Sequence, residues 1–257
     1  MMNLRPIKIL TLTGVLSLGS VVATQAAEVL QNAVIRADFD DQGLTAIHNL
    51  TAQKTLGIAH DDTALFLGDD VLDTEFQKPA LESSTATNRT YRLQSGRWTA
   101  RIIYELEPGW HFLAKRVEVT ADGERDFRVR RLELLRGQLA TAPEDELRQR
   151  ETTFLRYAGH GVFVTLQNPF GQWKRQGERI SLAYPPDLVW SPGTKAFVSD
   201  RVCLGVYTPT GITYPVRLSP EWKLPPSGTT DQGPRIDVAE VDAAVECSRA
   251  FLSYRPT

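Results

Sequence analysis

The sequence predicts an all-β, antiparallel fold that ends in one amphipathic helix. Three observations favour this class. Apolar and polar residues alternate with period two along residues 28–220, as in strands with one buried face. Turn sequences containing Gly and Asp separate these runs, and the final segment changes to a helical period. Hydrophobic residues make up 42% of the 257 residues, which is enough for a sizeable core.

The N-terminal segment predicts an export signal. Arg5 and Lys8 flank the start of an uncharged apolar run at residues 9–23, which small residues follow at 24–27. This run is shorter than the roughly 20 residues that span a bilayer, although an uncleaved anchor is the alternative. We expect residues 1–27 to be removed, which leaves a periplasmic or secreted chain without a membrane span.

The first strands are expected between residues 33 and 50. Every second side chain is apolar at residues 33–39, and the alternation returns at residues 44–50. The Asp-Asp-Gln-Gly sequence at residues 40–43 is typical of a turn, because Gly accepts a positive φ. The segment predicts a β-hairpin.

The middle of the chain gives the most regular pattern. Residues 97–106, 111–120 and 125–135 each alternate, and Asp122-Gly123 supplies a turn between the last two runs. We expect a three-stranded antiparallel meander. Its polar positions carry Arg and Glu, which suits cross-strand charge pairs on a solvated face.

Other segments are less regular. The polar residues 141–151 predict a short helix or an exposed loop, and the acidic residues 60–76 predict a solvated loop. Further strands are expected between residues 161 and 218. Pro and Gly are frequent from residue 169 to residue 234, which predicts long loops of the kind that often carry function.

The C-terminal segment, residues 235–257, predicts the helix. Asp237 can cap it, and Glu240 three residues later completes a capping box. Pro256 is expected to end the helix. The expected packing stripe consists of Val241, Ala244, Val245, Ser248, Phe251 and Leu252.

Composition and motifs exclude several classes of function. The net charge is −2 and no basic tail is present, so we expect no nucleic-acid partner. Cys203 and Cys247, the two cysteines, either form a disulfide in an oxidising compartment or stay as buried free thiols. No Cys-x-x-Cys or His-x-His motif is present, so we expect no metal site, and we expect no cofactor.

The opening of the predicted domain resembles a known family. The segment NAVIRADFDDQGLTAIHNLTAQKTL has a strand, an acidic Gly turn, Leu-Thr-x-Ile and a short turn to Lys54. It resembles the start of the β-supersandwich domains of glycoside hydrolases, in the galactose-mutarotase-like class. Thr51-Ala52-Gln53-Lys54 stands where members often have Thr-Gly-Lys. The resemblance implies an antiparallel supersandwich over residues 28–234.

The resemblance also implies a role in carbohydrate processing. In several such hydrolases, a helical linker joins the supersandwich to a catalytic barrel. Residues 235–257 are expected either to lead toward such a barrel domain or partner chain, or to pack across the sandwich. The first reading is a non-catalytic, carbohydrate-binding domain. The alternatives are a free-standing sugar mutarotase or epimerase, and an envelope interaction module without sugar binding. We expect no catalytic activity in this chain alone.

Candidate sugar-binding residues lie between residues 160 and 190. Aromatic rings offer flat apolar faces to sugar rings, and amides and carboxylates orient sugar hydroxyls. Trp173, Trp190, Asn168 and Asp187 supply this mixture. His160 lies between two glycines, which allow a ligand to approach closely. The alternatives are that the tryptophans pack in the core or at a strand edge, and that His160 bonds to backbone.

Overall fold

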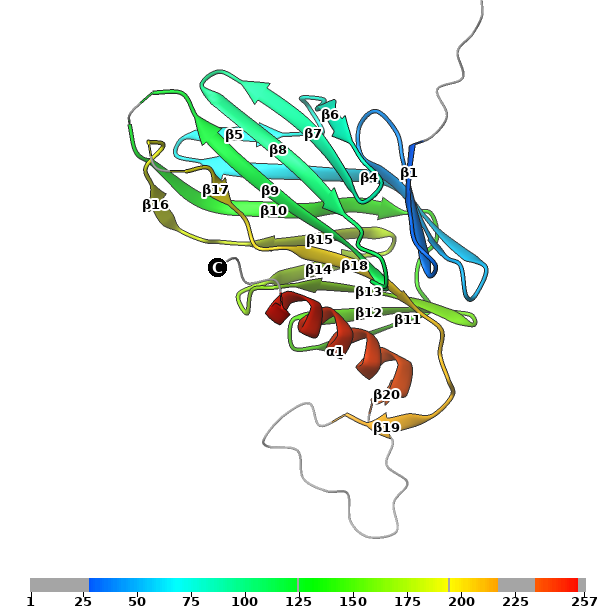
Figure 1. Cartoon of the computed structure of the whole chain (residues 1–257). Coiled ribbons are helices and arrows are strands. Elements are labelled where there is room, and N and C mark those ends of the chain that lie inside the picture. The colour runs from blue at the N-terminus through cyan, green and yellow to red at the C-terminus, as the bar shows by residue number, and fades with distance from the viewer. Residues whose placement is uncertain (1–27, 124, 194, 217–233, 254–257) are drawn as a thin grey trace, which may run out of the picture.

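The computed structural model describes residues 28–123, 125–193, 195–216 and 234–253, so the expected signal peptide lies outside the described residues. Within these residues, two large antiparallel sheets pack face to face, and a small sheet and one helix complete the fold (Figure 1). The predicted all-β sandwich with a C-terminal helix is confirmed. The one helix among these residues is too short or too polar to cross a bilayer.

The first sheet has nine strands in the described residues, and two long strands lie beside each other near its middle. They are β1 (Glu28–Gln31), β2 (Ile35–Phe39), β3 (Leu44–Asn49), β4 (Lys54–Leu67), β5 (Asp70–Asp73), β10 (Phe127–Leu139), β14 (Gln172–Gln176), β15 (Arg179–Tyr184) and β16 (Leu188–Trp190). Their order is β1-β2-β3-β4-β10-β15-β14, with β5 on β4 and β16 on β10.

The second sheet also has nine strands in the described residues. They are β6 (Ala80–Ser84), β7 (Asn88–Ser95), β8 (Trp98–Glu105), β9 (Phe112–Ala121), β11 (Asp145–Gln149), β12 (Thr152–Tyr157), β13 (His160–Leu166), β17 (Phe197–Val198) and β18 (Val202–Tyr207). Their order is β11-β12-β13-β18-β9-β8-β7-β6, with β17 on β9. A separate pair is formed by β19 (Thr213–Pro215) and β20 (Arg235–Asp237).

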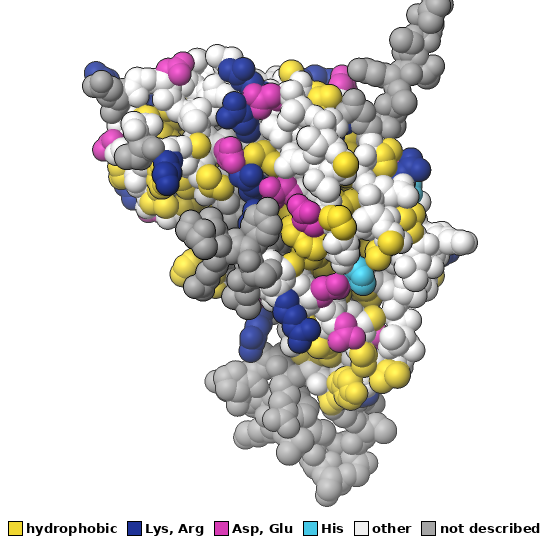
Figure 2. All heavy atoms as spheres, viewed as in Figure 1, with side chains coloured by type: hydrophobic (Ala, Val, Ile, Leu, Met, Phe, Trp, Pro, Cys, Tyr) yellow, Lys and Arg dark blue, Asp and Glu magenta, His cyan; other side chains and the backbone are white. Residues whose placement is uncertain are grey.

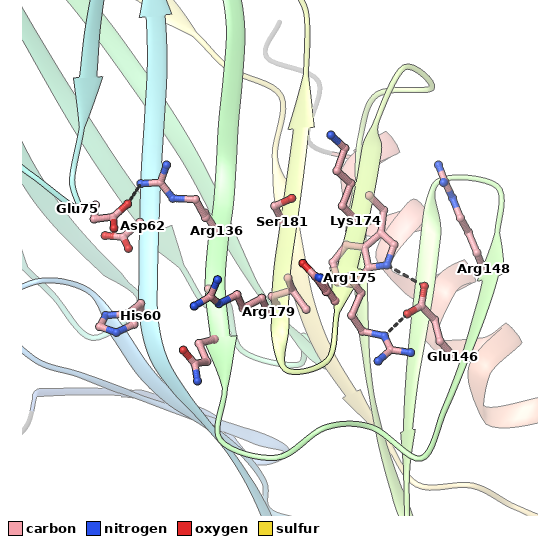
Figure 3. A pocket seen from close by; sticks show the side chains of 15 residues that line it. His60, Asp62, Glu75, Arg136, Glu146, Arg148, Lys174, Arg175, Arg179 and Ser181 are labelled. Atoms are coloured by element: carbon pink, nitrogen blue, oxygen red, sulfur yellow. Dashed lines mark hydrogen bonds and ion pairs between the residues drawn. The ribbon is translucent and has the colours of Figure 1, made fainter.

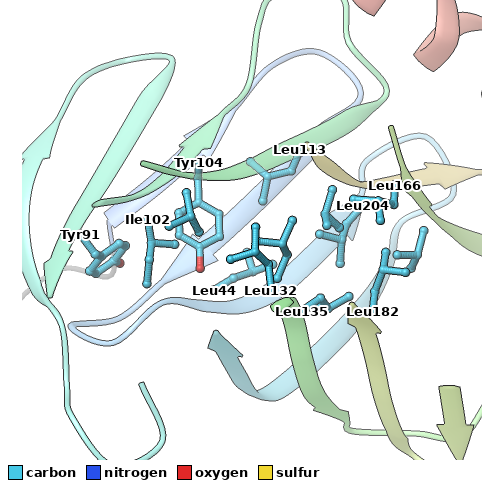
Figure 4. Close-up of a cluster of buried hydrophobic side chains, with 14 of the residues drawn as sticks. Leu44, Tyr91, Ile102, Tyr104, Leu113, Leu132, Leu135, Leu166, Leu182 and Leu204 are labelled. Carbon is cyan, nitrogen blue, oxygen red and sulfur yellow. The ribbon is translucent and has the colours of Figure 1, made fainter. Parts of the chain in front are cut away.

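The core lies between the inner faces of the two sheets. Leu132 and Leu182 of the first sheet belong to the same buried cluster as Tyr104 and Leu204 of the second (Figure 4). Alternation along each strand sends every second side chain into this layer. The sequence assigned the inward face of residues 98–106 correctly, since Trp98 and the four apolar residues that alternate after it are all buried.

The sandwich core also encloses an ion pair. Lys115 Nζ of β9 lies 2.6 Å from Asp61 Oδ1 of β4, and both side chains are 0% exposed. The Tyr104 hydroxyl donates to Asp61 Oδ2 at 2.5 Å. Burial, reinforced by the nearby Asp61 carboxylate, raises the pKa of Tyr104 well above its usual value. Because Asp61 points inward, its neighbours His60 and Asp62 point to the outer face of the first sheet.

The outer face of the second sheet carries ion pairs, as the sequence predicted for the meander. Arg101 pairs with Glu82 at 2.7 Å, and Glu105 receives Arg116 at 3.3 Å and Arg201 at 3.2 Å. Basic and acidic side chains form a band across this face in Figure 2. The Arg101–Glu82 pair is the more exposed one and contributes little stability by itself, whereas the pairs of Glu105 are partly buried.

The predicted three-stranded meander is wrong in its third strand. The strands β8 and β9 pair as expected, but β10 crosses to the first sheet and pairs with β4, β15 and β16. The other edge of β9 is already occupied by β18 and β17. The Asp122-Gly123 turn therefore begins a crossover between sheets instead of a hairpin.

Two polar segments are strands instead of loops or helices. Residues 145–149 form β11, which pairs with β12 through five consecutive residues and buries Leu147. The acidic residues 60–76 contain the second half of β4 and all of β5. In both cases strand pairing overrides the local composition, because strand preference depends strongly on the neighbouring strands.

The helix α1 (Val238–Ser253) packs on the outer face of the second sheet, against β18 and β13 (Figure 1). Its N-terminus confirms the predicted capping box. The Ala239 N–H donates to Asp237 Oδ1 at 2.9 Å, and the Asp237 N–H donates to Glu240 Oε2 at 2.9 Å. The described part of the helix therefore lies across the sandwich, which is one of the two arrangements the sequence allows.

The predicted packing stripe of the helix is wrong at Val241, Val245 and Ser248, whereas Ala244 packs partly buried against the sheet. Ala243 and Cys247 are buried, whereas Val241 and Val245 are 38% and 40% exposed. The side chains of the predicted residues 251 and 252, and the expected helix end at residue 256, lie outside the described residues.

A buried carboxylate explains the rotation of the helix. Glu240 is 1% exposed and accepts two hydrogen bonds from Arg156 of β12, at 2.7 and 2.8 Å, and one from Tyr207 at 2.8 Å. This anchor turns the Glu240 face of the helix toward the sheet. The small side chains of Ala243 and Cys247 then allow a close approach to the sheet.

Both cysteines are free, buried thiols, which is one of the two states the sequence left open. Cys203 of β18 and Cys247 of α1 belong to the same buried cluster. Burial, reinforced by the neighbouring Cys247 thiol, raises the pKa of the Cys203 thiol well above its usual value.

Candidate functional site

A groove of about 1060 Å³ crosses the outer face of the first sheet and reaches β11 of the second (Figure 3). Its lining comes from β4, β10, β15 and β14, with the Glu75 carboxylate at one side and β11 at the other. Pockets for small ligands commonly measure roughly 300–1,000 Å³, so this groove can hold a ligand at the large end of that range.

The register of four strands places polar side chains in two rows across the floor of the groove. The first row consists of Asp62, Arg136, Ser181 and Lys174, which lie opposite one another on β4, β10, β15 and β14. The second row consists of His60, Gln138, Arg179 and Gln176 on the same strands. Neighbouring strands lie about 4.8 Å apart and the rows about 6.7 Å apart, so the floor is a regular array of polar groups.

A glycine keeps the two rows aligned. Gly137 lies between them on β10, opposite Asp61 of β4. A Cβ atom at this position would lie 2.6 Å from the carbonyl oxygen of His60, which is too short for a contact between a side-chain carbon and a backbone oxygen. Gly137 therefore allows β10 to approach β4 closely where both strands present their groove residues.

The wall of the groove at β11 joins the two sheets. The Trp173 indole N–H of β14 donates to Glu146 Oε1 at 2.8 Å, and the Arg175 guanidinium pairs with Glu146 Oε2. Arg148, also on β11, donates to the Gly171 carbonyl at 3.2 Å. Trp173 thus lines the groove, and the hydrogen bond from its indole nitrogen holds the ring in place. The same residue also packs on the sandwich core.

The opposite side of the groove contains a second set of ion pairs. Arg136 contacts Asp73 at 2.5 Å and Glu75 at 3.0 Å. Burial favours the neutral form of Arg136, but the hydrogen bond to Asp73 and the nearby carboxylates outweigh it and raise its pKa. Asp62 accepts a hydrogen bond from the Thr74 hydroxyl at 3.0 Å.

Of the predicted site residues, Trp173 lies in the groove. Trp190 and Asp187 do not line it. Trp190 lies opposite Phe127 at the start of β10. Trp173 lies opposite Leu182 of β15, which in turn lies opposite Leu135 near the end of β10. Eight residues of strand separate these positions, which corresponds to roughly 26 Å.

Trp190 and Asp187 have local structural partners. The Trp190 indole N–H donates to the Lys195 carbonyl at 2.8 Å, and its ring packs edge-on against Phe197. Asp187 forms two hydrogen bonds with Arg128, at 2.7 and 2.9 Å, which lower the pKa of its carboxyl.

Asn168 and His160 also lie outside the groove lining. Asn168 donates to Asp200 at 2.8 Å and accepts from the Phe170 N–H at 2.9 Å, so both ends of its amide are engaged in a loop. The His160 ring stacks on Tyr157 with centroids 5.0 Å apart, and its Nδ1 lies 3.3 Å from the Ala158 carbonyl. The structure therefore brings none of the other four predicted residues next to Trp173.

Sequence reasoning missed the two rows because each strand contributes only two of their residues. The available signal is a pair of polar residues two positions apart, as in 60 and 62, 136 and 138, 174 and 176, and 179 and 181. Such pairs are common on any solvated strand face. Only the register shows that these four pairs adjoin.

The groove offers hydrogen-bond donors, acceptors, an aromatic ring and several cations. His60 and Asp62 lie on the same face of β4, where an imidazole and a carboxylate could each exchange protons with a ligand. In the described part of the chain, no group of three or more His, Cys, Asp or Glu side chains is arranged to hold a metal ion.

Comparison with known proteins gives matches only to solved structures. No protein-family model matches the chain, and no curated protein matches it. A galactose mutarotase related enzyme from Lactobacillus acidophilus matches with a TM-score of 0.41 and 10% identity, over 70% of this chain and 97% of that one. A galactose mutarotase-like protein from Lactobacillus casei matches with a TM-score of 0.43 and 8% identity, over 70% and 99%.

Longer proteins match over part of their length. An alpha-mannosidase from Enterococcus faecalis has a TM-score of 0.42 and 10% identity, and the match covers 74% of this chain and 30% of that one. The chain thus spans less than a third of the mannosidase. Two of the matched structures have names of the galactose-mutarotase-like class that the opening of the sequence resembles. At these identities and TM-scores, the similarities carry no information on substrate or activity.

Proposed function

We propose that the chain is an exported, non-catalytic module that binds carbohydrate in the two-row groove. The observation that carries the proposal is the combination of Trp173 with a polar floor in one groove of about 1060 Å³. An aromatic ring suits the C–H face of a sugar, and polar side chains around it suit the hydroxyls. Gln138, Ser181 and Gln176 make no side-chain hydrogen bond within the described residues, which leaves them available to a ligand.

The rigidity of the groove supports a binding role. The polar side chains of the floor lie on paired strands and not on loops, so their spacing is fixed before a ligand arrives. The Glu146 carboxylate fixes the Trp173 indole from the second sheet. Such preorganisation reduces the conformational entropy that the protein loses when it binds a saccharide.

Titration calorimetry with a panel of neutral and acidic oligosaccharides tests the proposal. We expect at least one saccharide to bind the mature chain at micromolar to millimolar concentration. Trp173→Ala should weaken that binding about 3- to 10-fold, if a ring contact is worth about 0.5–1.5 kcal/mol as in other aromatic pairs. Trp190→Ala is the matched control and should leave binding unchanged. Circular dichroism must first show that both variants are folded.

The outcomes separate the alternatives. Equal weakening by Trp190→Ala would place the site elsewhere. If no saccharide of the panel binds the folded wild type at millimolar concentration, the proposal is wrong. An envelope interaction module without sugar binding would then be the better reading.

Export rests on the N-terminal sequence alone, where Arg5 and Lys8 flank the start of an apolar run and small residues. We expect the mature chain to be periplasmic or secreted and to have lost about 26 or 27 residues. Intact-mass measurement of the exported protein tests this. A cytosolic product that retains its N-terminal residues would contradict it.

A sugar mutarotase or epimerase is the second candidate, and one observation favours it. His60 and Asp62 share the floor of the groove with the nearby Glu75 carboxylate, which are the groups that acid–base chemistry on a sugar needs. Polarimetry or proton NMR of freshly dissolved sugars would detect the activity. Anomer exchange that is faster than in buffer and lost in His60→Asn would support it.

A catalytic barrel domain or partner chain is the partner we propose for a non-catalytic module. The proposal rests on the resemblance of the N-terminal strands to glycoside hydrolase supersandwich domains. The coding sequence that follows Thr257, and co-purification from the native host, test it. A host that encodes no barrel protein beside this chain, and yields none on purification, would contradict it.

A further inference from the structure

The groove contains more cationic than acidic side chains. Its cationic residues are Arg136, Arg148, Lys174, Arg175 and Arg179, and its acidic residues are Asp62, Glu75 and Glu146. The whole chain has a formal net charge of −2. The excess of positive charge is therefore a local property of the groove.

The three carboxylates of the groove are already engaged. Glu146 accepts hydrogen bonds from the Trp173 indole and from Arg175. Glu75 pairs with Arg136, and Asp62 accepts from a threonine hydroxyl. These contacts also occupy two of the five cations. Within the described residues, Asp62 has no cationic partner and keeps its negative charge, so five cations and three carboxylates leave the groove with a formal net charge of +2.

The remaining cations lie on β15, β14 and β11, from the middle of the groove to its side at β11 (Figure 3). Lys174 and Arg179 make no hydrogen bond or ion pair within the described residues, and Arg148 contacts only a backbone carbonyl. Lys174 and Arg179 are diagonal neighbours on β14 and β15, a pairing whose residues lie about 7–8 Å apart. Arg148 lies on β11, on the far side of Lys174 from Arg179 (Figure 3).

We propose that the ligand of this groove is an acidic oligosaccharide, whose uronate carboxylates are bound by Arg179, Lys174 and Arg148. The inference rests on the proposed carbohydrate-binding function and specifies its ligand class. A guanidinium binds a carboxylate through two parallel hydrogen bonds, and an ammonium binds it as a point charge. Trp173 receives a ring face, while the uncharged groups of the two rows receive hydroxyls. The groove volume favours an oligomer over a single sugar.

Titration calorimetry with matched ligands tests the inference. The probes are tetramers of galacturonate, mannuronate and glucuronate, each compared with the same tetramer after reduction of its carboxylates to primary alcohols. Linkage and size then stay constant within each pair. We expect at least one acidic tetramer to bind ten times more tightly than its reduced counterpart in 50 mM salt. This advantage should shrink in 0.5 M salt, because exposed charges are screened there.

Charge-removing variants locate the site. Arg179→Gln and Lys174→Gln should each weaken binding of the acidic tetramer several-fold and leave binding of its reduced counterpart within twofold. Lys195→Gln is the matched control, because Lys195 is exposed and lies beside Trp190, outside the groove lining. It should leave both affinities unchanged. Equal effects of all three variants would overturn the assignment of these cations.

The remaining outcomes distinguish this inference from the function on which it rests. If the reduced tetramers bind as tightly as the acidic ones, the groove binds carbohydrate but the acidic specificity is wrong. If none of the six tetramers and no neutral saccharide binds, both are wrong. If glucose 6-phosphate or tripolyphosphate binds more tightly than every tetramer, the cations serve a phosphate and the uronate assignment is overturned.

Discussion

The buried pair of Lys115 and Asp61 allows a sharp test of how the core holds the groove in place. Lys115→Met replaces the ammonium by an apolar side chain of similar length. Asp61 would then be a carboxylate with 0% exposure whose remaining side-chain partner is the Tyr104 hydroxyl. Since Asp61 lies between His60 and Asp62 on β4, the change acts directly behind the floor of the groove.

The expected loss of stability follows from the burial. Removing one partner of a buried ion pair costs about 3–5 kcal/mol, because the other charge stays buried without compensation. A domain of this size loses roughly 2–4 °C in melting temperature per kcal/mol, so the variant should melt about 6–20 °C below wild type. Domains commonly have only about 5–15 kcal/mol of stability, so the effect should be plain.

A compensated variant provides the control. Lys115→Met combined with Asp61→Leu and Tyr104→Phe removes every polar group of the cluster at once. It should recover most of the lost stability, because an apolar replacement of a buried ion pair is often neutral or stabilising. Retaining the Tyr104 hydroxyl should cost about 1–3 kcal/mol, since that hydroxyl loses its carboxylate acceptor.

Thermal unfolding gives the melting temperatures of wild type, the single variant and the triple variant, and urea unfolding gives their free energies of unfolding, both followed by circular dichroism. The reasoning predicts that the single variant is the least stable and that the triple variant lies near wild type. If Lys115→Met is as stable as wild type, the pair is not buried as the structure describes. If the triple variant is less stable than the single one, the pair contributes net stability and the argument from desolvation is wrong.

Three further predictions concern the helix and the cysteines. Glu240→Gln should destabilise the chain by about 1–3 kcal/mol in urea unfolding, because the Arg156 guanidinium loses its buried charged acceptor and keeps the exposed Asp145 carboxylate as its charged partner. An unchanged midpoint would contradict the proposed anchor. Burial alone would raise the pKa of Asp237, but hydrogen bonds from Thr210, from the Ala239 N–H of the helix and from the Gly211 N–H outweigh burial and lower the pKa. The ionised Asp237 carboxylate therefore stabilises the fold above the unfolded-state pKa of about 3.9, and this stabilisation is lost as the pH falls below that value. Asp237→Asn should make the free energy of unfolding depend less steeply on pH below about pH 4. An unaltered slope would contradict the role given to Asp237. Iodoacetamide should leave Cys203 and Cys247 unmodified in the native protein and should alkylate both after denaturation without reductant, whereas no alkylation would indicate a disulfide.

The sequence predicted what depends on local alternation. The inward face of residues 98–106, the first hairpin and the capping box of Asp237 and Glu240 all follow from residues that are close in the chain. It could not predict which sheet residues 127–139 join. That choice depends on β18 and β17, which pair with the edge of β9 that β8 leaves open. Both strands lie more than 70 residues after β9 in the chain.

The rotation of the helix was also beyond local reasoning. A periodic apolar stripe at Val241 and Val245 is the usual sign of a packing face. The actual face is set by Glu240, whose partners Arg156 and Tyr207 come from two strands of the second sheet. A buried carboxylate therefore determines which face of the helix packs on the sheet, whereas hydrophobicity alone predicted a different face.

The candidate site was predictable only in part. Trp173 was selected for its aromatic chemistry, and it lines the groove. Trp190 was selected for the same reason, and it lies roughly 26 Å away along β10. The rest of the groove is lined mainly by polar residues on five strands, such as His60 and Arg179, which carry no motif. Their proximity is a consequence of register, which depends on pairing between distant segments.

The claim that a saccharide occupies the two-row groove has one most direct test. Each tryptophan indole N–H gives its own signal in a proton–nitrogen NMR spectrum, and Trp173→Phe identifies the signal of Trp173. When the tightest-binding oligosaccharide is added to the labelled protein, the Trp173 signal should shift in proportion to occupancy, because its ring lines the groove. The signals of Trp190 and the buried Trp98 should stay in place. A saccharide that binds but shifts Trp190 instead, or shifts no indole signal, would contradict the site.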